Sequence, residues 1–335
     1  MDVCLEFLLQ GDYSHVYENN LPKESVSSRE SDFMQRIEII VVDDGSSDRT
    51  ASVVEERIQV GWFPHLKLIR QKHSGISAAR NRGLQESIGR YIWFIDADDT
   101  LEPLCLETII TSLHDCQSDL FKLGHLNTTG HHAHKGDITS TKKVTKAEIF
   151  GRYKGTLDHT TYLFRRDFLI ENHIWYPENM AILEDSVMVL NCLSHTQSVL
   201  YNPTFIFYCL DGHSTTRGLW DNMCRQRFLP SIHNFFNIFK DYVNLAEGED
   251  LIAAQNLYDR YLYVYQRVLL VKGCTMKELS LFKETAFIPN NFYYGKADFK
   301  MKIMKSQLLY GLLYVGYHCL GIPIRKILKN NNHAR

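Results

Sequence analysis

The sequence predicts an α/β fold built on a mostly parallel sheet, followed by a helical C-terminal region. Over the first third of the chain, short β-branched or aromatic runs alternate with helical segments. This alternation is typical of strand–helix–strand units with parallel strands. Hydrophobic residues make up 44% of the 335 residues and charged residues 23%, so the bulk of the chain is globular rather than disordered. The segment 218–335 is richer in helical pattern.

The composition also excludes several classes of protein. A formal net charge of -2 gives no overall positive field for nucleic acid. The eight cysteines contain no C-x-x-C pair, which argues against a zinc site and a small disulfide scaffold. The N-terminus carries no basic leader, so we expect no signal peptide and a cytoplasmic location.

The first elements follow from apolar periodicity. Residues 1–10 have apolar side chains at Val3, Leu5 and 7–9, and we expect a short amphipathic helix there. The polar segment 11–36 is predicted to be a loop. The β-branched run 37–42 predicts a buried parallel strand, which ends at a cluster of turn-forming and helix-capping residues.

The alternation then continues through the first third of the chain. The expected elements are a helix at 49–59, a strand at 66–70, a helix at 77–87, a strand at 91–95 and a helix at 103–115. Residues 119–217 are expected to mix strand and loop. In parallel sheets of this kind, ligands bind beyond the carboxyl ends of the strands. Two of the predicted strands end in aspartates, so these acids should lie at that edge.

One acidic cluster directly follows the apolar strand 91–95. Asp96, Asp98 and Asp99 carry like charges that disfavour one another, so a cation is their natural partner. Oxygen-only ligands suit Mg²⁺ or Mn²⁺ better than zinc, and such a cation can hold a diphosphate. The alternative is a helix N-cap with additional surface acids, and the pattern alone leaves both open.

Three further positions could carry chemistry. Asp43 and Asp44 offer carboxylates that can accept hydrogen bonds from a base or from ribose hydroxyls, or they cap the next turn. Arg80 follows a glycine turn and could reach a phosphate or an acidic loop. Glu184 and Asp185 follow an apolar stretch, where a carboxyl with a raised pKa can act as a general base.

Together these segments resemble the family 2 glycosyltransferases, which have the GT-A fold. The resemblance rests on "IEIIVVDDGSSD" (37–48), "HSGISAARNRGL" (73–84), "YIWFIDADD" (91–99), and "LED" (183–185) after "FRRDFL" (164–169). It covers roughly residues 1–217. The resemblance therefore implies a GT-A glycosyltransferase domain over 1–217 and a separate helical region over 218–335.

The resemblance also implies an activity and roles for these residues. The activity is inverting transfer of a sugar from a nucleotide-sugar donor, by default a UDP-sugar, to a glycan or lipid-linked acceptor hydroxyl in bacterial surface polysaccharide synthesis. Asp43 would contact the nucleotide base with Asp44 close by, and Arg80 would lie in the donor site. Asp98 would be the main ligand of Mg²⁺ or Mn²⁺, with Asp96 nearer the ribose. Asp185 would deprotonate the acceptor.

One feature departs from the family pattern. Family members begin with an apolar strand before the first helix, whereas this chain opens on "DVCLEFLLQ", which we interpret as that helix. We therefore expect the first strand to be missing, either because the reading frame is truncated or because another segment replaces it. A missing central strand would leave neighbouring backbone groups unpaired and would impair activity.

Two other functions fit parts of the sequence. The segment "FIDADDTL" (94–101) fits the opening of a haloacid-dehalogenase phosphatase, with Asp96 as nucleophile and Asp98 as acid, but leaves the other motifs unexplained. The expected loss of the first strand favours a non-catalytic nucleotide- or glycan-binding relic. A donor-binding assay beside a turnover assay separates the enzyme from the relic, and phosphomonoester hydrolysis tests the phosphatase.

The C-terminal segment 306–329 suggests a membrane-facing role. No charged residue lies between Ser306 and Ile324, and lysines and arginines flank this stretch. Its glycines, proline and polar residues argue against a transmembrane span. A helix lying in the membrane interface, on the inner face of the cell membrane, and a helix docked on the catalytic domain remain as alternatives.

Overall fold

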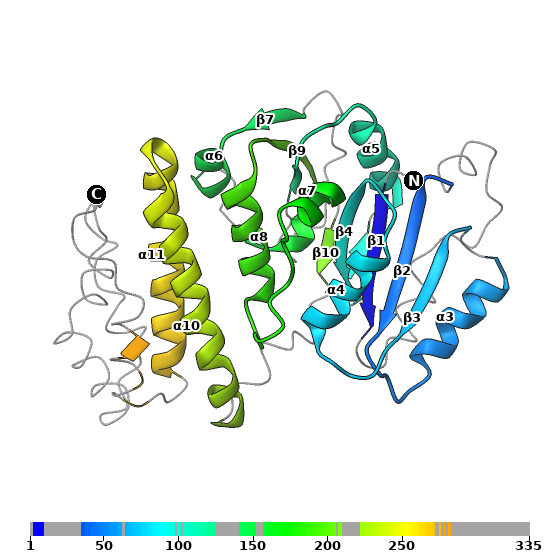
Figure 1. Cartoon of the computed structure of the whole chain (residues 1–335), viewed down its shortest axis with the longest axis horizontal. Coiled ribbons are helices and arrows are strands. Elements are labelled where there is room, and N and C mark those ends of the chain that lie inside the picture. Colours follow the sequence, from blue (N-terminus) through cyan, green and yellow to red (C-terminus); the bar gives the residue numbers. More distant parts are fainter. Residues whose placement is uncertain are drawn as a thin grey trace, which may run out of the picture. The chain divides into compact units, whose positions relative to one another are not determined.

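The computed structural model describes residues 3–9, 35–61, 64–97, 99–101, 103–124, 141–151, 157–205, 207–209 and 222–271, together with 275, 278, 281 and 282 (Figure 1). The chain divides into two compact units. Unit 1 comprises Met1–Thr145, Thr156–Met180 and Glu184–Ser214, and unit 2 comprises Lys146–Gly155, Ala181–Leu183 and Thr215–Arg335. The boundary expected at residue 217 stays a prediction.

Unit 1 is built on one mixed sheet. Its described strands have the order β3-β2-β1-β4-β8-β6-β9-β7. They are β1 (Val3–Leu9), β2 (Ile37–Asp43), β3 (Leu66–Arg70), β4 (Tyr91–Asp96), β6 (Leu120–Gly124), β7 (Lys142–Val144), β8 (Tyr162–Arg165) and β9 (Val199–Phe205). A separate antiparallel pair joins β5 (Asp99–Leu101) to β10 (Phe207–Cys209).

The expected helix at residues 1–10 is wrong, and the first strand is present. Residues Val3–Leu9 form β1, which pairs in parallel with β2 on one side and with β4 on the other. Figure 1 shows β1 between these two strands. A strand paired on both sides reads as a short apolar run, and periodicity alone does not distinguish such a run from one helical turn. The impairment expected from a missing strand therefore has no structural basis.

The described helices of unit 1 alternate with the strands along the chain. They are α3 (Thr50–Gln59), α4 (Ile76–Glu86), α5 (Pro103–Leu113), the 3₁₀ helix η2 (His159–Thr161), α7 (Arg166–Glu171) and α8 (Glu184–His195). The chain moves outward from β2 to β3 and then returns past β1 to β4. Because parallel crossovers are right-handed, this reversal puts α3 and α4 on opposite faces of the sheet.

One face of the sheet carries a continuous apolar core. Alternate residues of β2 and β4 pack with Val54 of α3 and with Ile109, Ile110 and Leu113 of α5. Trp93 is fully buried in this layer, and its indole N–H donates to the Thr160 carbonyl at 2.7 Å. Neighbouring side chains of a strand point to opposite faces of the sheet, and most side chains of β2 and β4 are apolar and buried on both faces.

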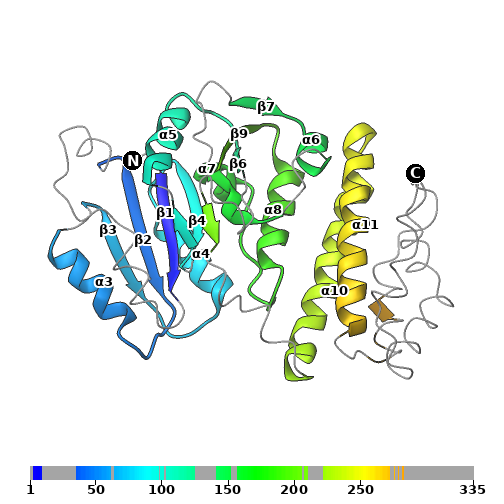
Figure 2. The ribbon, with the colours of Figure 1, turned by 180° about the vertical axis from the view of Figure 1, so that it is seen from behind.

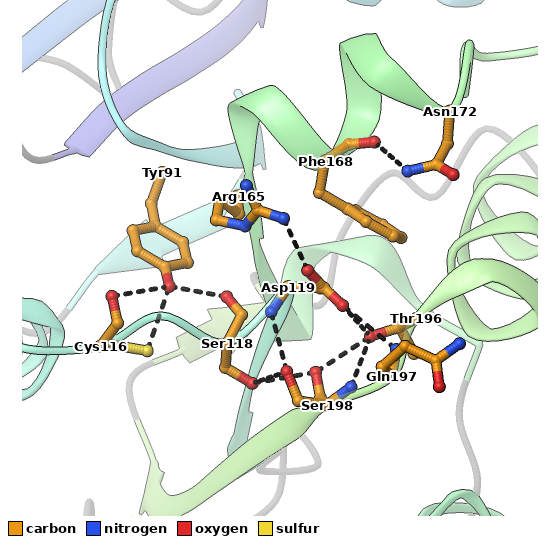
Figure 3. Close-up of polar contacts among 10 residues, drawn as sticks. All are labelled: Tyr91, Cys116, Ser118, Asp119, Arg165, Phe168, Asn172, Thr196, Gln197 and Ser198. Carbon is orange, nitrogen blue, oxygen red and sulfur yellow. Dashed lines mark hydrogen bonds and ion pairs between the residues drawn. The ribbon is translucent and has the colours of Figure 1, made fainter.

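A polar network holds the β6, β8 and α8 region together (Figure 3). The Asp119 carboxylate accepts from Arg165 Nη2 at 2.8 Å, from Thr196 Oγ1 at 2.9 Å and from the Gln197 N–H at 3.1 Å. Burial opposes ionisation of Asp119, but these donors outweigh it and lower its pKa. Figure 2 shows β6 and β9 side by side, and the Ser118 hydroxyl donates to the Ser198 carbonyl at 2.9 Å between them.

Unit 2 is helical in its described part, with α6 (Lys146–Gly151), α10 (Asn222–Leu245) and α11 (Gly248–Val271). An aromatic seam joins α10 to α11, including Phe236 against Tyr258 with ring centroids 5.3 Å apart. Asp250 accepts from the Ala147 N–H at 2.7 Å and so ties α11 to α6. Among the described residues, no helix is long and apolar enough to cross a membrane. The segment 306–329 lies outside these residues.

The expectation of strand and loop alone over 119–217 is wrong, because the helices α7 and α8 also lie there. Their cores depend on contacts with distant strands, which the local pattern does not show. The other predicted elements of unit 1 are confirmed to within one or two residues. The strand predicted at 66–70 is β3, the strand at 91–95 is β4, and the helices at 49–59, 77–87 and 103–115 are α3, α4 and α5. The predicted loop at 11–36 lies almost wholly outside the described residues. The α/β fold with C-terminal helices is therefore confirmed.

Candidate active site

Polar side chains gather where β2 and β4 end. Asp43, the last residue of β2, is in register with Leu9 of β1, and Asp96, the last residue of β4, is in register with Leu8. Both acids therefore lie at the carboxyl edge of the parallel strands, as the sequence predicts. Ligands of parallel α/β sheets bind at this edge.

Asp43 shapes the turn that follows β2. Its side chain is buried, and its Oδ1 accepts from the Ser46 N–H at 2.9 Å. Arg70, at the end of the neighbouring strand β3, places its Nε 3.5 Å from Asp43 Oδ2. The Asp43 carboxylate is thus fixed by its own turn and by the adjacent strand.

Asp44 organises the loop that leads into α4. Its side chain is fully buried and accepts from the N–H groups of Ser74 and Gly75, each at 2.8 Å. Gln71 Nε2 donates to the same carboxylate at 2.8 Å, and His73 Nδ1 lies 2.9 Å from it. The Asp44 carboxylate is therefore engaged by groups within the protein.

Arg80 joins two segments that are far apart in the sequence. Its Nη2 donates to Asp96 Oδ1 and its Nη1 to Glu184 Oε1, both at 2.8 Å. The guanidinium carbon also lies 5.2 Å from the centre of the Tyr176 ring. Burial opposes the charge of Arg80, but the carboxylates of Asp96 and Glu184 raise its pKa above the ordinary value. Arg80 therefore stays charged and links the end of β4 to the start of α8.

Asp96 is the more accessible carboxylate of this cluster. Its side chain is 39% exposed, against 10% for Glu184. Burial of part of the group opposes ionisation, but the positive charge of Arg80 outweighs it and lowers the pKa of Asp96. Asp96 is thus held ionised at neutral pH, with one oxygen bound to Arg80.

Asp185 lies next to Glu184 in the first turn of α8. Burial and the nearby carboxylates of Glu184 and Asp158 raise the pKa of Asp185 well above its ordinary value. Leu183, the residue before Glu184, has φ 65, a left-handed conformation that is rare for a branched side chain. Backbone outliers of this kind cluster at functional sites.

Asn81 fixes the segment that precedes the acid pair. Its side-chain amide donates to the Tyr176 carbonyl at 2.9 Å and accepts from the Tyr176 N–H at 2.8 Å. Arg80 and Asn81 are neighbours on α4, so one helix orients both the acid pair and the chain leading to it. This explains why the motif at 73–84 contains both residues.

Two buried polar groups around η2 are absent from the sequence predictions. His159 is 1% exposed, with its Nε2 3.8 Å from Asp96 Oδ1. Lys122 of β6 is 2% exposed and donates to Thr161 Oγ1 at 3.0 Å. Neither belongs to a recognisable motif, and only the pairing of β8 with β4 and β6 brings them to this region.

The resemblance implies a divalent cation, and the chemistry of Asp96 fits one. An ionised, partly exposed carboxylate is a hard oxygen ligand of the kind that Mg²⁺ and Mn²⁺ prefer. Asp98, the expected main ligand, lies outside the described residues. Within the described residues, no three His, Cys, Asp or Glu side chains gather in a metal-binding arrangement.

Comparison with known proteins gives the family. The family model described as "Glycosyl transferase family 2" matches residues 23–171, which contain β2 to β4, α4 and η2. This segment of the chain is similar to that family. The match covers Asp43, Asp44, Arg80 and Asp96 and ends before the Glu184–Asp185 pair.

Two curated bacterial proteins illustrate the relationship. The chain is 36% identical over 186 residues to the putative glycosyltransferase EpsH of Bacillus subtilis, covering 52% of each protein. It is 24% identical over 323 residues to the GalNAc(5)-diNAcBac-PP-undecaprenol beta-1,3-glucosyltransferase of Campylobacter jejuni, covering 93% of this chain and 90% of the relative. The chain spans about half the length of several curated relatives that it matches.

A solved structure shares the fold. S. aureus TarS 1–349 in complex with UDP-GlcNAc superposes with a TM-score of 0.68 at 16% identity, covering 96% of this chain and 93% of the TarS chain. The GT-A fold predicted from the sequence motifs is therefore confirmed, and residues 23–171 match the family 2 glycosyltransferases.

Proposed function

We propose that this glycosyltransferase transfers a sugar, with inversion, from a UDP-sugar to a hydroxyl of a glycan or lipid-linked acceptor in bacterial surface polysaccharide synthesis. The contact that carries this proposal is Arg80, which bonds the Asp96 carboxylate on one side and Glu184 on the other. Arg80 thereby links Asp96, the acid proposed to bind the donor, to the Glu184–Asp185 pair. Transfer by a single displacement requires the donor-binding acid and the general base in the same site.

The donor would lie at the carboxyl edge of β2 and β4. Asp43 would accept hydrogen bonds from the nucleotide base, and Asp96 would contact the ribose. Asp44 would act close by, by ordering the 71–75 loop through its bonds to Ser74 and Gly75. Asp96 and Asp98 would hold Mg²⁺ or Mn²⁺, which when bound offsets the negative charge of the departing diphosphate.

Asp185 would be the general base. Its carboxylate takes the proton from the acceptor hydroxyl as the acceptor oxygen forms a bond to the anomeric carbon. The bond between this carbon and the diphosphate oxygen breaks on the opposite side, and the nucleoside diphosphate leaves with the electron pair. A raised pKa makes Asp185 a stronger base than an ordinary aspartate. No nucleophilic side chain is needed for one displacement.

The acceptor class and the location are proposed from one relative. The Campylobacter jejuni relative, whose name includes an undecaprenol-linked substrate, matches over almost the whole of both chains. An acceptor of this kind would bring a cytoplasmic enzyme to the inner face of the membrane. Fractionation of cells that express the protein, with and without a salt wash, tests this location.

Thermal unfolding in the presence of nucleotides tests the donor site. UDP, GDP and CDP are each added with Mn²⁺ or with EDTA. A ligand at about 100 times its Kd adds about 2.7 kcal/mol of stability, a readily measured shift in Tm. We expect UDP with Mn²⁺ to raise Tm and EDTA to abolish the shift. A folded protein that no nucleotide stabilises would contradict the proposal.

Turnover then separates an enzyme from a binding relic. The protein is incubated with UDP-sugars and with extracts containing lipid-linked oligosaccharides, and UDP release is followed. Release that depends on the acceptor supports transfer. Nucleotide binding without any acceptor-dependent release would support the relic instead.

A further inference from the structure

His159 is a buried polar side chain with no hydrogen-bond partner among the described residues. It is 1% exposed, and both Nδ1 and Nε2 lack a partner. An unsatisfied buried polar group lowers the stability of the folded state, so such groups are rare and call for an explanation. Because His159 lies beside Asp96, a small movement of Asp96 could give the imidazole a hydrogen-bond partner.

The distance to Asp96 is informative. His159 Nε2 lies 3.8 Å from Asp96 Oδ1, too far for a direct hydrogen bond. A bridging water would need the two atoms to be farther apart, since each of its hydrogen bonds spans about 2.8 Å at an open angle. A relative shift of about 0.8 Å closes the gap to a normal N–H···O distance.

The imidazole is held in place, whereas Asp96 has room to move. The His159 ring meets Phe94 and Tyr176 edge-on, with centroids 6.1 and 5.7 Å away. Its backbone is fixed by Asp158, whose Oδ1 accepts from the Thr160 N–H at 3.0 Å. Asp96 ends a strand and is 39% exposed, and its Oδ1, the oxygen nearest His159, also accepts from Arg80 Nη2 at 2.8 Å. A carboxylate oxygen can accept from both donors at once. The shift that closes the gap is therefore a movement of the Asp96 carboxylate.

His159 can make this bond as a neutral donor, since in a neutral imidazole one ring nitrogen carries a proton. A bond from this N–H orients the Asp96 carboxylate without neutralising its charge, which stays available to a ligand.

We infer that His159 is a positioning residue of the donor site, which hydrogen-bonds to Asp96 when a nucleotide-sugar engages that carboxylate. This inference rests on the proposed function. The bond to Asp96 gives the imidazole the hydrogen-bond partner that it otherwise lacks among the described residues. A contact formed only in the bound state favours that state by its full free energy.

The test compares stability with nucleotide affinity in the full chain. His159→Phe keeps the ring shape and removes the unsatisfied nitrogens, so we expect a Tm without nucleotide equal to or above that of the wild type. We expect the Kd for UDP with Mn²⁺, measured by calorimetry, to rise about 5- to 100-fold. His159→Gln, which restores an N–H donor, should recover part of the affinity.

Thr196→Val is the matched control, because it removes a buried hydroxyl that bonds Asp119 rather than Asp96. It should lower Tm and leave the Kd for UDP within twofold of wild type. A His159→Phe protein that loses Tm, or binds UDP as the wild type does, would overturn the inference. If His159→Phe fails to fold, His159→Gln must bind UDP more tightly than His159→Leu, and equal Kd values overturn it.

The two proposals fail in different ways. A wild-type protein that binds none of UDP, GDP and CDP overturns the proposed function and, with it, the role of His159. A wild-type protein that binds UDP, beside a His159→Phe variant of unchanged affinity, overturns the inference alone.

Discussion

Asp185 is the residue on which turnover should depend most directly. Replacing it by asparagine removes the proton acceptor but keeps the shape of the side chain. We expect kcat to fall by about 10²- to 10⁴-fold, the usual contribution of a general base, with the Kd for UDP unchanged. The measurement is acceptor-dependent UDP release beside calorimetric UDP binding.

Glu184→Gln is the control for Asp185→Asn. Glu184 bonds Arg80 at 2.8 Å, so its loss should disturb the donor side as well and weaken UDP binding. If Asp185→Asn transfers sugar at the wild-type rate, Asp185 is not the base.

Lys122 gives a pH-dependent prediction about stability. Burial lowers its pKa to about 8, although Asp158 partly opposes this shift. Below pH 8 the folded protein buries a charged ammonium; between pH 8 and 10.5 the folded state loses the proton while the unfolded state keeps it. The lysine is therefore most costly at pH 7, and this cost disappears as the pH rises.

Lys122→Met should accordingly stabilise the protein more at pH 7 than at pH 10. At 1.36 kcal/mol per pKa unit, the advantage of methionine should shrink by about 2 kcal/mol between these two pH values. Urea unfolding of both proteins at both pH values measures this difference. An advantage that is constant or grows with pH would show that Lys122 is not charged and buried as described.

Sequence motifs identify candidate site residues that stand together in polar clusters, and they miss polar residues that stand alone. Asp43, Asp44, Arg80 and Asp96 stand in dense polar clusters after apolar runs. Their gathering at one edge follows from the parallel sheet. His159 and Lys122 are single polar residues in ordinary surroundings. His159 lies near Asp96 and Lys122 beside Thr161 because antiparallel β8 pairs with β4 and β6, a pairing that local sequence does not encode.

At the scale of elements, the turn after β2 depends on one glycine. Gly45 has φ +83, and a Cβ added there would lie 3.0 Å from the His73 backbone nitrogen. Gly45→Ala should therefore lower the free energy of unfolding by about 1–2 kcal/mol from the left-handed backbone alone, and by more because of the clash. We also expect weaker UDP binding, since Asp43 and Asp44 precede this turn. Urea unfolding and calorimetry measure the two effects.

Gly61→Ala provides the comparison for Gly45→Ala. Gly61 has φ +64, but no atom of the described residues lies within 4 Å of an added Cβ. It should show only the backbone cost and no change in UDP affinity. Equal losses in the two variants would mean that the contact with His73 contributes nothing.

The prediction for residues 1–10 fails for a reason that applies to other short elements. Seven residues can form two turns of helix or one strand, and their apolar positions satisfy both patterns. The choice is made by backbone pairing with β2 and β4, segments far along the chain. The longer alternation from β2 to α5 is predicted well because each element there has its own turn or capping signals.

At the scale of the whole molecule, the candidate donor residues Asp43, Asp44, Arg80 and Asp96 all belong to unit 1. UDP with Mn²⁺ should therefore slow amide hydrogen exchange in β2, in the loop 71–75, in α4 and in β4. We expect no comparable change in α10 and α11 of unit 2. Mass spectrometry of peptides after exchange measures this, and protection centred on α10 and α11 would contradict the placement of the donor site.

The central place of β1 has a consequence for biosynthesis. Residue 3 pairs with residue 37 on one side and with residue 91 on the other. During translation β2 emerges well before β4, so one hydrogen-bonding edge of β1 has no partner over that interval. An open strand edge is a template for association with other chains. Nascent protein is therefore most prone to aggregate between the synthesis of β2 and β4. Slower translation over this interval should increase aggregation, and a bound chaperone should reduce it.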